Sequence, residues 1–213
     1  FMLRKIKQLT GHNGSIFALS STESDRYFLS GAGEGWVVRW DLDDPELGKL
    51  VAKVETQIFA LHYLVTGNKV VVGNMDGGVH WVDLDNPDKT LNVAHHKKGV
   101  FAILEIGDHI LTAGGQGMLT RWNKESGQTI DSLRVSHQSL RAMAYNPVRG
   151  ELAVGASDNA IYILDATSLA VKQSIPNAHA NSVFSLCYNP AGDLLFSGGR
   201  DAHLKVWDAE ASY

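Results

Sequence analysis

The sequence has very little cysteine: Cys187 is the only one among 213 residues, so no disulfide can form within the chain. Cys187 lies in the apolar run SVFSLCY, and such a position favours a buried, unreactive thiol over a catalytic nucleophile. A chain without paired cysteines is typical of a reducing compartment. These absences exclude a small scaffold held together by disulfides.

Long apolar runs and an excess of basic residues are also missing. No segment approaches the roughly 18 apolar residues of a membrane-spanning helix, and the first residues have no apolar core of a secretory signal. The formal net charge is −4 and the pI is about 6.1, so the surface has no general attraction for nucleic acid or anionic lipid. We therefore expect a cytoplasmic protein that binds neither nucleic acid nor membrane.

The sequence does contain a fivefold internal repeat. SGGRDAHLKVWD at 197–208 is similar to SGAGEGWVVRWD at 30–41 and TAGGQGMLTRWN at 112–123, and weaker copies are VGNMDGGVHWVD at 72–83 and VGASDNAIYILD at 154–165. Successive copies end 40 to 43 residues apart, which is the period of a four-stranded propeller blade. Short β-branched and aromatic runs separated by Gly, Asn, Asp and Pro predict strands throughout the chain.

The repeats carry short signatures of one family. These are Gly11-His12, the Ser/Thr-Gly and Ala-Gly-Gly turns, Trp40-Asp41 and Trp207-Asp208. With these residues the chain resembles the WD-repeat β-propeller family. The resemblance implies an all-β protein built of four-stranded antiparallel blades, with five WD-type repeats at approximately 10–55, 56–95, 96–135, 136–178 and 179–213.

The last repeat ends without an outer strand, and residues 3–9 (LRKIKQL) match the outer strand of a blade. We expect this segment to be available to close the ring, which would give 20 strands in five blades. Rings of this family commonly have seven blades, so a closed ring of five and part of a larger propeller both remain open. An open ring would expose a strand edge and an apolar face that favour self-association.

Ser, His and Asp in the last repeat raise the question of a catalytic triad. The resemblance implies instead a structural network of His, Ser or Thr, Asp and Trp within a blade. Glu34 and Gln116 stand at the Asp position in repeats one and three. The expected network residues are His179, Ser197, Asp201 and Trp207 in repeat five, His12, Ser30 and Trp40 in repeat one, and His96, Thr112 and Trp122 in repeat three.

Repeats two and four support the structural interpretation. Val82 and Leu164 stand where the other three repeats have Trp. Ten residues earlier, at the position of the Ser or Thr hydroxyl, these two repeats have Val72 and Val154. A buried N–H without a partner costs about 1–3 kcal/mol, so joint loss of donor and acceptor is what a structural hydrogen bond predicts. His95 and His96 have no further ligands at fixed spacing. We therefore expect no catalytic residue, no metal and no cofactor.

The resemblance also implies that partners bind the loops that precede the innermost strands. Equivalent positions there hold four Phe and one Arg, a combination that suits an apolar side chain beside a carboxylate or phosphate. Two interpretations remain open: these residues form interblade core, or they are partly exposed around the mouth of a central channel. The candidate partner-binding residues are Phe17, Phe59, Phe101, Arg141 and Phe184, with Gln57, Met75 and Arg200.

The sequence thus predicts a non-catalytic scaffold that binds a protein or peptide partner on the loop face around the central channel. The alternative is a propeller hydrolase or lyase with its site in that channel. Such an enzyme would need acidic residues or histidines at the innermost strands, where this sequence has mainly Phe, Ser, Gln and Gly.

Overall fold

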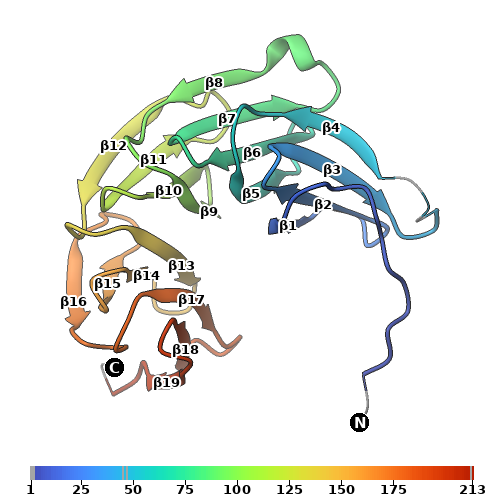
Figure 1. The fold of residues 1–213 in the computed structure, drawn as a ribbon. Coiled ribbons are helices and arrows are strands. Elements are labelled where there is room, and N and C mark those ends of the chain that lie inside the picture. The colour runs from blue at the N-terminus through green and yellow to red at the C-terminus, as the bar shows by residue number, and fades with distance from the viewer. Residues whose placement is uncertain (1–2, 45, 47, 212) are drawn as a thin grey trace. The chain divides into compact units, whose positions relative to one another are not determined.

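The computed structural model describes residues 3–44, 46, 48–211 and 213, and these form nineteen β-strands and one short 3-10 helix (Figure 1). The chain divides into two compact units, one up to Ala94 and one from His95 onward. Every sheet is antiparallel, and its strands pair in chain order. Among the described residues, no helix is long and apolar enough to cross a membrane.

The first unit holds two sheets, which we call blades one and two. Blade one consists of β1 (Ile16–Ser21), β2 (Tyr27–Ala32), β3 (Trp36–Asp41) and β4 (Lys49–Lys53). Blade two consists of β5 (Ile58–Leu64), β6 (Lys69–Asn74), β7 (Gly78–Asp83) and β8 (Leu91–Ala94), with the 3-10 helix Pro87–Lys89 before β8. Their facing side chains, including Ala18, Leu29, Ile58 and Leu61, form one buried cluster.

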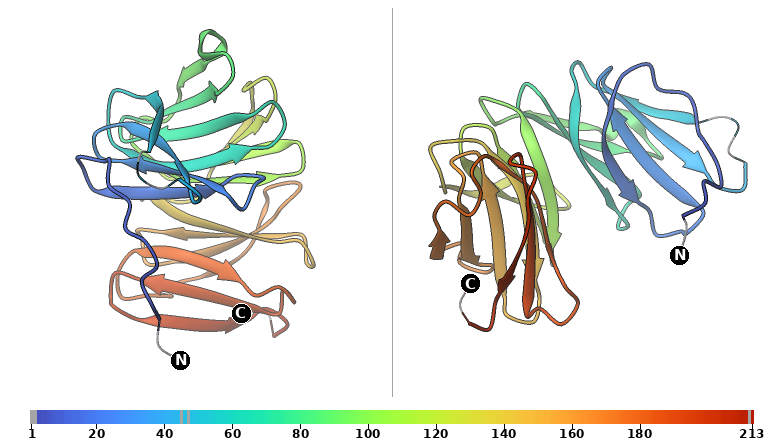
Figure 2. Two further views of the ribbon diagram at one scale, coloured as in Figure 1. Left: turned by 90° about the vertical axis from the view of Figure 1, so that its right-hand side faces the viewer. Right: turned by 60° about the horizontal axis from the view of Figure 1, so that its bottom comes forward.

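The second unit holds blades three, four and five. Blade three consists of β9 (Val100–Ile106), β10 (His109–Gly114), β11 (Met118–Asn123) and β12 (Thr129–Arg134). Blade four consists of β13 (Leu140–Asn146), β14 (Glu151–Ala156), β15 (Ile161–Asp165) and β16 (Val171–Ile175). Blade five consists of β17 (Val183–Tyr188), β18 (Leu194–Gly199) and β19 (Leu204–Asp208). In Figure 2 the strands of blades four and five lie side by side, and β13 and β14 contact β17. The expected all-β fold of antiparallel four-stranded blades is therefore confirmed.

Tight turns join the second and third strands of each blade. Gly117 adopts a φ of +81°, and an added Cβ would lie 1.9 Å from the carbonyl oxygen of Ser136. Only glycine fits there, because a side chain would meet both an unfavourable backbone conformation and a neighbouring backbone atom. This turn brings the residues before it, Gly115 and Gln116, next to the start of the innermost strand.

Two expectations differ from the structure. Residues 3–9 lie in no sheet, so blade five has three strands and the described residues form 19 strands instead of 20. A strand requires backbone hydrogen bonds to a neighbouring strand. The hydrogen bonds seen from this segment are instead donated by side chains: Lys5 donates to Gln8, and Lys7 donates to the carbonyl of Leu42. Cys187 is exposed instead of buried. Its blade-four equivalent, Ala144, is buried where β13 meets β17. No described residue packs in this way against the side of β17 that carries Cys187.

Candidate binding surface

One backbone hydrogen bond recurs in all five blades. The residue just before the innermost strand accepts it, and the residue just before the expected acid position donates it. The donor–acceptor pairs are Gly33–Ser15 (2.9 Å), Met75–Gln57 (2.8 Å), Gly115–Gly99 (2.8 Å), Ser157–Ser139 (2.8 Å) and Arg200–Ser182 (2.9 Å). These bonds hold the second turn of each blade against the start of its innermost strand.

A β-bulge follows immediately in each innermost strand. In blade one, Ile16 pairs with Ala32 and Ala18 pairs with Gly31, so Phe17 is the extra residue. The other blades show the same shift of register at the equivalent position. The five extra residues are Phe17, Phe59, Phe101, Arg141 and Phe184. Because a bulge turns one side chain away from the regular alternation of a strand, these residues leave the interblade core.

The exposure of the bulge residues agrees with this geometry. Phe17 and Phe184 are each 49% exposed, and the other three are partly buried. In the first unit the rings of Phe17 and Phe59 contact each other, with centroids 4.8 Å apart. None of the five residues is a fully buried core residue, so the interpretation of partial exposure describes them better.

Arg141 lies among aromatic rings in the second unit. Its guanidinium carbon is 4.0 Å from the ring centroid of Phe101 and 5.8 Å from that of Phe184. Its Nε donates a 3.0 Å hydrogen bond to the Ser157 hydroxyl. Partial burial lowers the pKa of Arg141, and no described carboxylate forms an ion pair with it. The site is therefore a cation held on aromatic faces, with hydrogen-bond donors left for an anion.

The remaining candidate residues are exposed residues of blades two and five. Gln57, Met75 and Arg200 are exposed, and each takes part in the recurring backbone hydrogen bond described above. The structure thus ties their backbones to the bulge of their own blade. It assigns their side chains no contact with the bulge residues.

The last blade contains the expected hydrogen-bonded network. Ser197 Oγ lies 2.8 Å from His179 Nε2 and accepts the indole N–H of Trp207 at 2.9 Å. His179 Nδ1 lies 2.9 Å from Asp201. The backbone N–H of Ala180 and the bond from His179 hold the pKa of Asp201 well below its usual range. The hydroxyl thus has two partners that are both part of the blade framework.

Blade one repeats the arrangement, with Glu34 in the acid position. Ser30 Oγ lies 2.6 Å from His12 Nε2 and accepts the indole N–H of Trp40 at 2.7 Å. His12 Nδ1 is hydrogen-bonded to Glu34. Glu34 therefore binds Nδ1 of the histidine in blade one, as the shorter Asp201 binds Nδ1 of the histidine in blade five.

Blade three keeps only part of the network. Thr112 Oγ1 lies 2.8 Å from His96 Nε2 and accepts the indole N–H of Trp122 at 2.9 Å. His96 Nδ1 and Gln116 Oε1 are buried without hydrogen-bond partners among the described residues. Burial, together with the nearby His95, lowers the pKa of His96 to about 4. His96 is therefore held in its neutral form.

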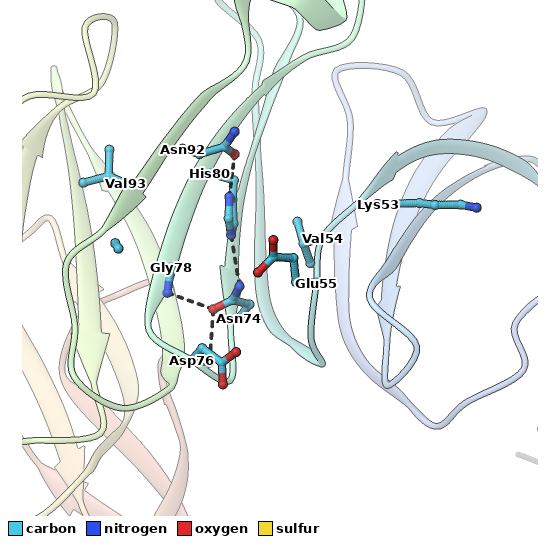
Figure 3. A pocket seen from close by; sticks show the side chains of 10 residues that line it. Lys53, Val54, Glu55, Asn74, Asp76, Gly78, His80, Asn92 and Val93 are labelled. Carbon is cyan, nitrogen blue, oxygen red and sulfur yellow. Dashed lines mark hydrogen bonds between the residues drawn. The ribbon is translucent and has the colours of Figure 1, made fainter.

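Blades two and four lack the Trp and the hydroxyl, and they differ from each other at the His position. In blade four Ser136 stands at the His position and donates a 2.6 Å hydrogen bond to Asp158. In blade two Val54 stands at the His position, and a pocket of about 620 Å³ opens beside it (Figure 3). His80 Nε2 lies 3.1 Å from Asn74 Nδ2, and His80 Nδ1 lies 2.6 Å from Asn92 Oδ1.

This pocket was not predicted from the sequence. Both ring nitrogens of His80 have hydrogen-bond partners, so the ring is not placed as a free base. Two exposed carboxylates, Glu55 and Asp76, also line the pocket. In the sequence, blade two differs from blades one, three and five in having Val54 at the position where these have His. No group of three or more metal-binding side chains occurs in the described part of the chain.

Comparison with known proteins identifies relatives of this architecture. The family "WD domain, G-beta repeat" matches residues 3–41 and 171–208. The chain is 25% identical over 183 residues to a THO complex subunit 6 homolog of Danio rerio, covering 76% of this chain and 56% of that protein. It is also 25% identical over 221 residues to guanine nucleotide-binding protein subunit beta-5b of Danio rerio, covering 99% and 56%. The chain therefore spans little more than half the length of either relative.

Solved structures show the same fold. The WD40 β-propeller domain of Doa1 superimposes with a TM-score of 0.83 at 16% identity, covering 96% of this chain and 68% of that one. The computationally designed Ika8 protein gives a TM-score of 0.77 at 23% identity, covering 94% and 60%. At these identities the likeness establishes the fold alone.

Proposed function

Because this chain is a WD-repeat protein with the β-propeller fold, we propose that it is a non-catalytic scaffold. It binds a protein or peptide partner through the bulge residues on the loop face of its blades. Proteins of this family generally serve in protein interactions, and the single cysteine supports a reducing compartment, the cytoplasm. Fold alone does not determine function, so the proposal depends on the chemistry of the surface.

The observation that carries the proposal is the position of Arg141 between Phe101 and Phe184. An arginine that is partly desolvated, stacked on rings and without a carboxylate partner is suited to bind a planar anion from another molecule. The half-exposed ring of Phe184 offers an apolar contact beside it. Arg and aromatic side chains are also the residue types that dominate binding energy at protein interfaces. The proposed ligand is a peptide with a carboxylate or phosphate next to an apolar side chain.

The test is selection of peptides from a displayed library on the immobilised chain. We expect the selected sequences to share an acidic residue next to an apolar one, and to lose binding to the Arg141→Ala variant. The Arg134→Ala variant is the matched control, because Arg134 is an exposed arginine on the outer strand of the neighbouring blade. Synthetic peptides with aspartate or phosphoserine at the selected acidic position distinguish the two anions.

Two results would overturn the proposal. One is a set of selected peptides without a common anion. The other is anionic peptides that bind wild type and Arg141→Ala with equal affinity.

A further inference from the structure

Carboxylates at the acid position of the blades bind a hydrogen-bond donor from their own blade. Glu34 in blade one and Asp201 in blade five are each hydrogen-bonded to Nδ1 of a histidine. In blade four, Asp158 accepts hydrogen bonds from the hydroxyls of Ser136 and Tyr162, both at 2.6 Å. Each of these three acids therefore has an N–H or O–H partner within its blade.

Blade two has an acid at the same position but no such donor. Asp76 stands at the acid position, and Val54, at the histidine position, has no polar side-chain atom. His80, at the position of Tyr162 in blade four, is hydrogen-bonded to two asparagines instead. Among the described residues, no side chain donates a hydrogen bond to the Asp76 carboxylate. This carboxylate lines the pocket of about 620 Å³ that opens beside Val54.

A row of hydrogen bonds fixes one wall of this pocket (Figure 3). Asn74 is buried, and its Oδ1 accepts the backbone N–H groups of Asp76 at 3.2 Å and Gly78 at 2.8 Å. Its Nδ2 therefore donates to His80 Nε2, and His80 Nδ1 donates to Asn92 Oδ1. The wall is thus in place before a ligand binds, and neither ring nitrogen of His80 is left to bind one.

The pocket carries negative charge that the chain does not neutralise. Glu55 and Asp76 both line it and are both exposed, and neither forms an ion pair with a described residue. In Figure 3 the Glu55 side chain points toward the row of hydrogen bonds, whereas Lys53 points away from it. The Lys53 ammonium lies 5.0 Å from the ring centroid of Trp36. The basic side chain of the lining is therefore held on an aromatic ring outside the pocket.

These features suit a guanidinium group. Its five N–H donors lie in one plane with its positive charge, so it can bind two carboxylates and stack on a ring such as that of His80. A guanidinium is also more weakly hydrated than an ammonium, so it loses less on entering the pocket. Val54, Val93 and Ala94 offer apolar contacts to the methylene groups of an arginine side chain.

We propose that the pocket of blade two binds the side chain of an arginine from a partner protein. The guanidinium supplies the N–H donor that Asp76 lacks and that a histidine supplies to Glu34 and Asp201. It also pairs with Glu55. The pocket contains none of the bulge residues, and the inference does not depend on the proposed function.

The first test is an NMR titration of the isotope-labelled chain with acetyl-arginine methylamide. We expect saturable shifts of the backbone amides of Asp76 and Gly78 and of the Asn92 side chain, with a dissociation constant on the order of 1 mM for so small a probe. Acetyl-citrulline methylamide, which is uncharged and similar in shape, should bind at least about tenfold more weakly. Nα-acetyl-lysine methylamide should bind several-fold more weakly.

Three results of this titration would overturn the proposal. The first is equal affinity for the arginine and citrulline probes, because the pocket would then not recognise charge. The second is equal affinity for the arginine and lysine probes, because it would then not recognise the guanidinium. The third is an absence of shifts at these residues at probe concentrations well above 1 mM.

The second test changes the carboxylates. Asp76→Asn and Glu55→Gln should each weaken binding of the arginine probe about three- to fivefold, and the double variant at least about tenfold. Asp88→Asn is the matched control, because Asp88 is an exposed carboxylate of the same blade outside the pocket lining, and this variant should bind like wild type. All three side chains are exposed, so the variants should fold, which circular dichroism checks. Unchanged binding by the double variant would contradict the site.

The third test fills the pocket from within. The imidazole of Val54→His should bind Asp76 as His179 binds Asp201, and affinity for the arginine probe should then fall at least about tenfold. Val54→Ala is the matched control, since it changes the same position without adding a donor and should keep binding. Val54 packs against the buried cluster of blades one and two, so thermal unfolding checks both variants. A folded Val54→His chain that binds like wild type would refute the proposal, and the carboxylate variants decide independently of its folding.

Discussion

Trp122 donates its indole N–H to the hydroxyl of Thr112 at 2.9 Å, and both side chains are fully buried. Thr112→Val keeps the shape but removes the hydroxyl that this N–H and His96 Nε2 bind. We expect it to lower the free energy of unfolding by about 1–3 kcal/mol. Chemical denaturation of wild type and variant measures the difference.

The matched control for this prediction is a double-mutant cycle. Trp122→Phe removes the donor, so adding Thr112→Val to it should cost less than Thr112→Val alone. Blade two already shows the apolar solution, with Val72 and Val82 at these positions. Strictly additive effects would show that the hydrogen bond does not stabilise the blade.

Gln116→Glu should change how stability depends on pH. The pKa of His96 is lowered to about 4 in the folded chain, and in the unfolded chain it is about 6.5. The unfolded state therefore takes up a proton first as the pH falls, so stability is present above about pH 6.5 and is lost toward pH 4, by up to about 3 kcal/mol. A glutamate that accepts from His96 Nδ1, as Glu34 does from His12, should raise this pKa.

The measurement is the unfolding free energy of wild type and Gln116→Glu at several pH values between about 4 and 7. The variant should lose less stability than wild type on acidification. Parallel curves for the two proteins would show that position 116 does not set the ionisation of His96.

Gly117→Ala should destabilise more than Gly107→Ala. Both glycines have positive φ, but a Cβ at Gly117 meets the carbonyl of Ser136 and one at Gly107 meets nothing within 4 Å. The Gly107 variant therefore pays only the backbone strain, about 1 kcal/mol, and the Gly117 variant adds a steric clash. Thermal unfolding of both variants compares them directly, and equal midpoints would refute the role given to this turn.

Ile161→Ala and Leu204→Ala compare one position in successive blades. Ile161 is buried, so its truncation should cost about 2–5 kcal/mol. Leu204 is exposed, and its truncation should stay within about 0.5 kcal/mol when the chain is dilute and monomeric. A large loss from Leu204→Ala in the dilute chain would mean that part of the same molecule covers this face.

Sequence reasoning predicted the blades because the repeat reports strand period and turn residues directly. Two properties depended on neighbours outside each repeat. Cys187 lies in an apolar run, yet it is exposed because no described residue packs against the side of β17 that carries it. Residues 3–9 have the pattern of an outer strand, but a pattern does not specify which edge a strand joins.

The binding surface was only half predictable. Equivalent positions in five repeats located Phe17 and Arg141, but their exposure depends on a bulge, and a residue list does not reveal which strand residue is left unpaired. The pocket of blade two lies beside Val54, which stands at the His position. Two of its lining residues, His80 and Asn92, are hydrogen-bonded to each other across the adjacent strands β7 and β8. Such cross-strand pairs follow from register, which the spacing of the repeats does not give.

The most direct test of the central claim is calorimetric titration of a selected anionic peptide into wild type, Arg141→Ala and Arg134→Ala. The account predicts that Arg141→Ala binds at least about tenfold more weakly, which is about 1.4 kcal/mol, and that Arg134→Ala binds like wild type. Equal affinity of all three proteins would contradict the assignment of Arg141 and its aromatic neighbours as the partner-binding surface.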